Sequence, residues 1–428
     1  VSGLSKDYVY PNIYAGYDTF PNIDPISRLR GDKREALGTL WYHDHRVMFT
    51  SGNVYKGLAG FYLLFDNQDS GNENDRNPNA FRLPSGRFDV PLIFQDKTFD
   101  SSCNLFFDQL DPNAFVGDKF AVNGKIQPFF RVARRKYRFR MLNGGPSRWY
   151  QLYLDPAPPN APIVDGVPLP FTQIATDGNI LTGPVPREFI RIGVARRDDV
   201  VIDFSKYKIG DQVFLTNRLQ QIDGRGPVWD PATGQFVLDP PPGTPLLRFD
   251  VDYDAVDNSR VPETLRELPD LPDLTTVPET IIAFNRLGSA ADPWSVRVTP
   301  PGGPAGTDFI YDGTPNPFLQ QQPGGSTIWN LQNNSGLNPE TWTHPIHHHL
   351  EESRILSRQV GVPGTTQFVD VPLPPEDLGG RKDVIELPPR NRVRIFFRFR
   401  EFHGKYLLHC HNTVHEDHAM MARWDVVP

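Results

Sequence analysis

The sequence predicts an all-β protein with more than one domain. Its 428 residues exceed the usual size of one small domain. Pro occurs 43 times, Gly 35 times and 12% of the residues are aromatic, which is typical of many short strands joined by turns. Changes in composition divide the chain into a first unit at residues 1–80, a second at 81–257, a linker at 258–278 and a third at 279–428.

The first informative block lies at residues 38–66, GTLWYHDHRVMFTSGNVYKGLAGFYLLFD. His43 and His45 are two residues apart, so in a strand they share one face and can serve one metal or bridge two. Asp44 points to the other face, where we expect its side chain to hold an imidazole N–H. The alternative is a histidine pair on the surface. GLAGFYLLF predicts a buried strand.

A turn-rich boundary segment lies at 67–87, and the strands of the second unit follow it up to residue 253. In RRKYRFRMLNGG, apolar residues alternate with Arg138 and Arg140, which predicts a half-buried strand with its arginines in solvent. An anion or nucleic-acid site is the alternative, but the net charge of −7 disfavours nucleic acid as a partner. No apolar run reaches about 18 residues, so we predict no membrane span.

The third unit carries two histidine-rich segments. In THPIHHHLEESRILSR, Pro345 interrupts regular pairing, so a bent strand can aim His344 in one direction and His347 and His349 in another. A surface histidine tract is the alternative. The second segment, HCHNTVHEDHAMM, contains the His409-Cys410-His411 triplet.

Two imidazoles, a thiolate and a weak axial thioether form the ligand set of a blue-copper site. The second segment supplies Cys410, His415 and Met420 for such a site. Successive strand residues face opposite ways, so Cys410 can face one metal while His409 and His411 face another. Zinc is the alternative, because the His411-x3-His415 spacing fits it. The 11 histidines lie in only three short segments, which indicates metal centres over scattered structural histidines.

Glu416 and Asp417 lie beside these residues and are candidate proton donors, since a general acid must sit within hydrogen-bond reach. A salt bridge or a ligand-orienting hydrogen bond is the alternative for both. Cys103 has no cysteine partner in the chain once Cys410 is assigned to metal. We expect Cys103 to be a buried apolar thiol, or else to pair with a segment outside residues 1–428.

Taken in order, WYHDH, HPIHHH and HCHNTVHEDHAMM resemble the multicopper oxidases, and SKDYVYPN, GLAGFYLL and RKYRFR extend the resemblance to the bilirubin-oxidase and spore-coat-laccase branch. The resemblance implies three cupredoxin-like Greek-key β-barrel domains. It also implies copper as the cofactor: one type 1 ion, one type 2 ion and a type 3 pair. By position, the implied type 1 ligands are His344, Cys410 and His415 with Met420 axial. The implied ligands of the other three ions are His347 (type 2) and His43, His45, His349, His409 and His411 (type 3).

The resemblance further implies an oxidase that is secreted or lies in the cell envelope. A small reducing substrate, such as a phenol, an aminophenol or a bilirubin-like tetrapyrrole, would dock near His344 and Trp342, and dioxygen would become water. Two alternatives stay open: an oxidase of Fe(II) or Mn(II), and a type 1 electron-transfer protein with an incomplete cluster. With four Met the chain lacks the Met-rich segment expected for Cu(I).

The chain departs from the family pattern at one place. The family has a first His-x-His some tens of residues before WYHDH, and residues 1–42 contain none. We therefore expect the first domain to be incomplete in this chain, with a preceding segment as the partner that brings two more histidines. His348, His403 and His418 match no ligand position, and the resemblance assigns no role to residues 15–37.

Overall fold

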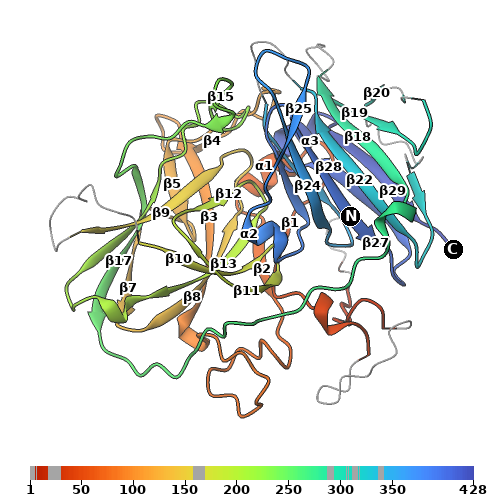
Figure 1. Ribbon diagram of the computed structural model, residues 1–428. Helices are drawn as coiled ribbons and strands as arrows, with labels where there is room; N and C mark the ends of the chain where they lie inside the picture. The colour runs from red at the N-terminus through yellow and green to blue at the C-terminus, as the bar shows by residue number, and fades with distance from the viewer. Residues whose placement is uncertain are drawn as a thin grey trace.

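The predicted all-β class is confirmed. The computed structural model describes residues 5, 7–17, 30–157, 169–286, 294–304, 306, 308–310, 317, 319–335 and 342–428, so much of the stretch 15–37 lies outside the described residues. Within these ranges, two large pairs of β-sheets lie beside each other and a smaller N-terminal region joins them (Figure 1). None of the described helices is long and apolar enough to cross a membrane.

The N-terminal region holds a two-stranded antiparallel sheet of β1 (Thr39–His43) and β2 (Ala59–Leu63). The short helix α1 (Thr50–Tyr55) lies in the connection, and a 3-10 turn at Lys33–Glu35 precedes β1. Such a small sheet is marginally stable by itself. It is anchored to the next region by Thr39, whose hydroxyl donates to Asp199 over 2.8 Å. This anchor fixes the strand that ends at His43.

The second region is a sandwich of two sheets around one apolar core. Its larger sheet has the order β11-β10-β13-β8-β3-β5-β6 with β4 beside β3, and its smaller sheet has the order β12-β9-β14-β17-β7. A hairpin of β15 and β16 lies outside both sheets. The strands are β3 (Asp89–Phe99), β4 (Leu105–Phe106), β5 (Lys119–Val122), β6 (Lys125–Ile126), β7 (Phe129–Ala133), β8 (Lys136–Asn143), β9 (Tyr150–Ala157), β10 (Phe171–Thr176), β11 (Asn179–Arg187), β12 (Ile190–Ile192), β13 (Arg197–Asp203), β14 (Gln212–Asn217), β15 (Trp229–Asp230), β16 (Gln235–Phe236) and β17 (Thr244–Tyr253).

The third region repeats this plan around a second core. Its sheets have the orders β20-β19-β18-β22-β27-β24-β25 and β21-β29-β28-β23-β26. Strand neighbours that are distant in sequence, such as β23 and β28, bring separate histidine segments together. The elements are β18 (Glu279–Arg286), β19 (Trp294–Thr299), β20 (Asp308–Phe309), β21 (Leu319–Gln321), β22 (Ser326–Asn333), β23 (His344–His348), β24 (Arg354–Gly361), β25 (Phe368–Val371), α2 (Pro375–Leu378), β26 (Val384–Leu387), β27 (Asn391–Arg398), β28 (Gly404–Cys410), α3 (Thr413–Asp417) and β29 (Met421–Val426).

The prediction that Arg138 and Arg140 face solvent is wrong. Both side chains are buried on β8, with exposed fractions of 1% and 0%. Arg138 pairs with Asp69 and Asp199, and Arg140 pairs with Asp89. A buried guanidinium is tolerated because carboxylates and hydrogen bonds replace its water. The apolar alternation on the other face of β8 was predicted correctly, and these arginines join the N-terminal region to the second region.

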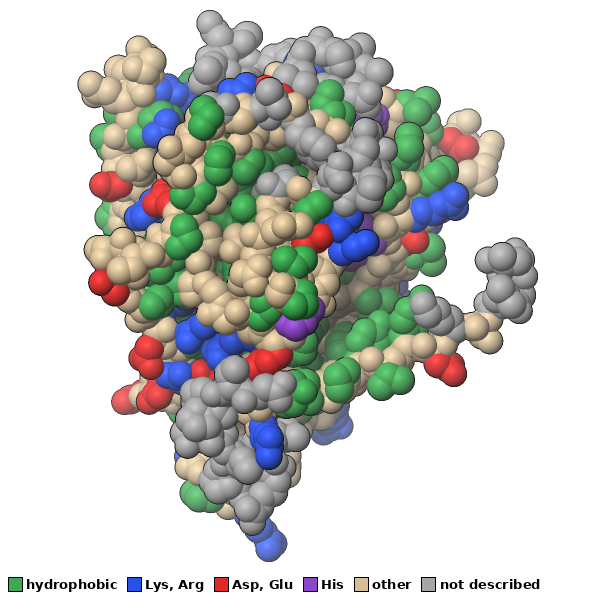
Figure 2. All heavy atoms as spheres, turned by 90° about the vertical axis from the view of Figure 1, so that its right-hand side faces the viewer, with side chains coloured by type: hydrophobic (Ala, Val, Ile, Leu, Met, Phe, Trp, Pro, Cys, Tyr) green, Lys and Arg blue, Asp and Glu red, His purple; other side chains and the backbone are tan. Residues whose placement is uncertain are grey.

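The N-terminal region leaves large apolar side chains in solvent. Tyr8, Val9 and Tyr10 are 67%, 87% and 68% exposed, and Tyr42 on β1 is 64% exposed. Figure 2 shows hydrophobic side chains gathered on one face of the molecule and along a segment that projects from it. Contiguous exposed apolar surface is uncommon in a protein with no partner at that surface.

Candidate metal centres

The pairing of β23 with β28 sets the two sides of the candidate centres. Ile346 lies opposite Cys410 and His347 lies opposite His409 in this antiparallel ladder. Because side chains alternate along β28, Cys410 and His409 point to opposite faces of the sheet. The strand ends at Cys410, and the chain then turns into α3.

The turn into α3 returns the chain to Cys410. Asn412 is the N-cap of α3, and its side chain accepts a hydrogen bond from the Val414 amide. The helix places His415 beside Cys410, and the Cys410 amide donates to the Met420 carbonyl over 3.0 Å. The end of β28, the Asn412 cap, the helix α3 and Met420 thus follow one another in a single compact loop.

On one face of the sheet lies a cluster of His344, Cys410 and His415. The Cys410 Sγ lies 3.4 Å from Nδ1 of His344 and 3.6 Å from Nδ1 of His415. All three side chains are fully buried, as is the adjacent Met420. Burial raises the pKa of Cys410 well above its usual value and lowers the pKa of His344 to about 3. The imidazoles are therefore neutral, as metal ligands must be.

The outer ring nitrogens of this cluster also have protein neighbours. The His344 Nε2 lies 2.5 Å from the Ser335 hydroxyl, and the His415 Nε2 lies 3.3 Å from the Asn412 side-chain nitrogen. Trp294 lies against His415 with ring centroids 4.4 Å apart. Ser335 and Trp294 could not be recognised from the sequence, because neither lies in a histidine-rich segment. Asn412 was detectable as a helix cap, since Asn is favoured at that position.

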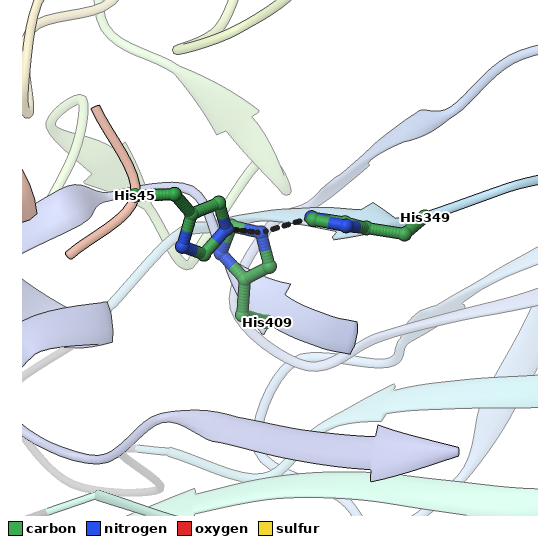
Figure 3. Close-up of side chains that lie close together, drawn as sticks. All are labelled: His45, His349 and His409. Carbon is green, nitrogen blue, oxygen red and sulfur yellow. Dashed lines mark hydrogen bonds between the residues drawn. The ribbon is translucent and has the colours of Figure 1, made fainter. Parts of the chain in front are cut away.

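On the other face lie six histidines from all three segments. Their closest ring nitrogens face one another: Nε2 of His409 lies 3.4 Å from Nε2 of His45 and 3.2 Å from Nε2 of His349. Figure 3 shows these three rings converging on a common point. His411 meets His43 in the same way, with 3.2 Å between their Nε2 atoms. His347 completes the group, with its ring 5.4 Å from that of His409 and 5.5 Å from that of His411.

Protein acceptors hold the opposite edges of these rings. The His347 Nδ1 lies 2.8 Å from the Asp383 carbonyl, and the His43 Nδ1 lies 2.7 Å from the Asp44 carbonyl. The expectation that the Asp44 side chain holds a ring is therefore wrong: that carboxylate accepts from the Arg46 amide and the Asn53 side chain instead. An imidazole fixed at Nδ1 presents Nε2 to a metal.

Glu416 holds two rings at once. Its Oε1 lies 3.3 Å from Nδ1 of His45 and its Oε2 lies 3.0 Å from Nδ1 of His409. Burial alone would raise the pKa of Glu416, but the attraction and hydrogen bond of His409 outweigh it and lower the pKa to about 2. The carboxylate is thus ionised near neutral pH and lies within ion-pair distance of both rings.

The donor sets of both clusters fit copper. Two nitrogen ligands that each lie about 2.0 Å from one ion at a tetrahedral angle are about 3.3 Å apart. The Nε2 pairs at 3.2–3.4 Å match that spacing. Burial lowers the pKa of His347, His349 and His411 well below the usual value, so these rings are neutral donors. The other cluster offers one cysteine sulfur and two imidazoles, a soft donor set that copper binds.

Asp417 is placed differently from Glu416. Its carboxylate accepts from the Thr50 amide over 3.1 Å, and from the amide and hydroxyl of Ser51 over 2.9 and 2.6 Å. These contacts tie α3 to the first turn of α1. Asp417 therefore positions the segment that follows His43 and His45, and its role in proton delivery stays a prediction.

The remaining expected residues are placed as follows. Trp342 is buried, with the Arg286 guanidinium carbon 4.5 Å from its ring centroid and the Trp294 ring 5.5 Å away. His348 is buried, its Nε2 lies 3.1 Å from the Ser353 hydroxyl, and its ring centroid lies 6.4 Å from that of His347. His403 is exposed. The expectation of a buried Cys103 is wrong: it is an exposed free thiol in a turn.

The chain is similar to known proteins over nearly its whole length. A family model described as Multicopper oxidase matches residues 287–428. A bilirubin oxidase of Albifimbria verrucaria is 34% identical over 99% of this chain and 63% of its own length, and a laccase of Bacillus stratosphericus is 32% identical over 91% and 71%. The McoA multicopper oxidase of Aquifex aeolicus has a similar structure, with a TM-score of 0.71 and 27% identity over 94% of this chain and 77% of that one.

Proposed function

Because this chain belongs to the multicopper oxidase family, as its similarity to the laccase establishes, we propose that it couples two redox reactions. Four one-electron oxidations of an organic substrate supply four electrons. One dioxygen molecule takes these electrons and four protons and becomes two water molecules. Copper is the cofactor of the family, and the cupredoxin-like fold of its members agrees with the two sandwiches of this chain.

The observation that carries the proposal is the position of Cys410 between the two clusters. Its Sγ lies in the cluster with His344 and His415, while its covalent neighbours His409 and His411 lie in the six-histidine cluster. An electron that arrives at the sulfur is therefore one residue from the other site. A protein that only binds a metal has no need for this arrangement, and neither does a simple electron carrier.

Each cluster has a distinct task in this proposal. Bound copper supplies one-electron redox chemistry and the capacity to bind dioxygen. His344, Cys410, His415 and Met420 form the type 1 site, where electrons enter. His43, His45, His347, His349, His409 and His411 form the trinuclear site. Glu416 orients His45 and His409 and is the ionised group nearest the second site, so we assign it the transfer of protons.

For the substrate we propose an organic electron donor: a phenol, an aminophenol or a bilirubin-like tetrapyrrole. Support comes from the bilirubin oxidase and laccase names of the relatives. It also comes from two aromatic side chains: the Trp294 ring contacts His344, and the Trp342 ring contacts Trp294. Steady-state kinetics on the copper-loaded protein test this proposal. A higher kcat/KM for a phenol or bilirubin than for Fe(II) or Mn(II) supports the organic substrate. A higher kcat/KM for Fe(II) or Mn(II) would show that the protein is a metal-ion oxidase.

We further propose that a His-x-His segment outside residues 1–428 completes the trinuclear site. His43, His45, His347 and His349 are only partly buried, so the described cluster is open to solvent on one side. The exposed apolar side chains of the N-terminal region are suited to pack against such a segment. A polypeptide proven to begin at Val1 should keep type 1 copper, bind little type 2 copper and reduce dioxygen slowly. Four copper ions per chain in that polypeptide would contradict the proposal.

The location that we propose, secreted or in the cell envelope, rests on the family resemblance alone. Fractionation of the producing cells tests it: the protein should appear in the medium or the envelope fraction, and a purely cytoplasmic distribution would contradict it.

A further inference from the structure

A cavity of about 280 Å³ lies between the second and third regions, apart from both metal clusters. The second region contributes the segment from β11 to β12 and the β15–β16 hairpin, and the third contributes β24, α2 and β26. Cavities between domains are common places for small ligands. We call this space the interdomain cavity.

The interdomain cavity is lined by more cations than anions. Five basic side chains meet three carboxylates there: Arg187, Arg191, Arg196, Arg358 and Lys382 against Glu376, Asp377 and Glu386. Each of these carboxylates already has a cationic partner. Glu376 pairs with Arg187, Asp377 with both Arg358 and Lys382, and Glu386 with Arg196. Arg196 also pairs with Asp198 behind the wall.

Arg191 is the cation that this network leaves without a partner. Its Nε donates to the Gln151 side chain over 3.0 Å, and it forms no ion pair with any carboxylate in the described part of the chain. Burial lowers the pKa of Arg191, and the attraction of Glu386 offsets only part of that effect. A partly buried guanidinium without a counter-ion is unfavourable, so an anion at this position would stabilise the fold.

The packing of Arg191 leaves one edge of its guanidinium available. Its Cζ lies 4.9 Å from the ring centroid of Phe236 and 5.7 Å from that of Phe189, so aromatic rings hold it in place. In the described residues neither Nη atom of Arg191 has a hydrogen-bond acceptor. A guanidinium held in this way can donate two parallel hydrogen bonds to two oxygens of one oxyanion. On the other wall, the Nε of Arg358 donates to Asp377 and its Nη1 donates to the Glu386 carbonyl. The Nη2 of Arg358 can therefore donate to a bound anion.

We propose that the interdomain cavity binds a small oxyanion, a phosphate or a dicarboxylate, with Arg191 as its main partner. The cavity spans two regions, so the bound anion should also hold them together. The proposal is independent of copper and of the reaction assigned above.

Calorimetric titration and thermal unfolding of the copper-loaded protein test it. Inorganic phosphate and malonate are compared at constant ionic strength, with chloride as the balancing anion. We expect saturable binding of at least one of the two and a higher Tm in its presence, because a ligand that binds only the folded state stabilises it. The anion that binds more tightly, phosphate or malonate, shows whether the cavity is a phosphate site or a dicarboxylate site. Absence of saturable binding by both would overturn the proposal.

Variants assign the binding to Arg191. Arg191→Gln should weaken it roughly tenfold or more, because one charge-assisted fork is lost. Arg131→Gln is the matched control: it removes the same charge from an exposed position on β7 and should bind as the wild type does. Arg191→Lys keeps the positive charge but loses the two-pronged guanidinium, so it should weaken anion binding less than Arg191→Gln does. If Arg191→Gln does not fold, the affinity of Arg191→Lys provides the test instead. Unchanged affinity in Arg191→Gln, or in Arg191→Lys if only that variant folds, would overturn the proposal.

Discussion

The Oε2 atom of Glu416 lies 3.0 Å from Nδ1 of His409, across the turn that joins α3 to β28. The same carboxylate faces His45 from the N-terminal region at 3.3 Å. One side chain therefore faces two rings that come from different parts of the chain.

Glu416→Gln should slow dioxygen reduction about 10–100-fold, the usual cost of losing a group that orients a metal ligand. The amide lacks the negative charge that the carboxylate presents to both rings, and it cannot carry a proton. Stopped-flow absorbance should show that the substrate reduces the type 1 site at the wild-type rate. Equal slowing of both steps would mean that Glu416 serves only the fold.

Cys410→Ser should abolish the blue absorption of the copper-loaded protein, since that band requires a thiolate on Cu(II). Met420→Leu should keep the band and raise the reduction potential of the type 1 site, because it removes a weak axial donor. Visible spectra and a redox titration check both variants. Zinc in the purified protein and a colourless copper-loaded form would contradict the assignment.

Asp417→Asn should lower the free energy of unfolding by about 1–2 kcal/mol, because Asp417 accepts from the first turn of α1. Chemical denaturation measures this loss. Dioxygen reduction should suffer less than in Glu416→Gln. A variant of wild-type stability that cannot reduce dioxygen would instead show that Asp417 delivers protons.

Asp377→Asn should lower the free energy of unfolding by about 3–5 kcal/mol at neutral pH, because it leaves Arg358 and Lys382 without their buried partner. Burial would raise the pKa of Asp377, but Arg358 and Lys382 outweigh it and lower that pKa. The wild-type advantage should therefore be complete above the ordinary Asp pKa of about 3.9 and shrink as the pH falls below it.

Denaturation curves from pH 7 down to pH 3 give the comparison for Asp377. Asp370→Asn is the control: Asp370 is exposed, and its loss should change the free energy of unfolding by less than about 0.5 kcal/mol. A gap between wild type and Asp377→Asn that widens toward low pH would contradict the account.

The separation of the two clusters could be predicted from the sequence because it depends on local geometry. Alternation along β28 alone sends Cys410 and His409 to opposite faces. The interruption expected at Pro345 is wrong, because β23 pairs with β26 through Pro345 without a register shift. His344 and His347 are three residues apart on this strand, so alternation alone sends them to different clusters. Short motifs fix such directions within a few residues, whatever the rest of the chain does.

The partners of the buried arginines could not be predicted in this way. Arg138 meets Asp69 and Asp199, which lie 69 and 61 residues away in the chain, so alternation alone placed it in solvent. Ser335 and Trp294 escaped detection for the same reason, since their nearness to His344 and His415 is a product of tertiary packing. The exposure of Cys103 also depends on a turn that composition does not reveal.

The most direct test of the central claim is stopped-flow absorbance of the blue band in the copper-loaded protein. Anaerobic substrate should bleach the band, and subsequent mixing with dioxygen should restore it, because electrons pass from the Cys410 site to the six-histidine site. A band that stays bleached while dioxygen is consumed would contradict the claim that Cys410 connects the two sites.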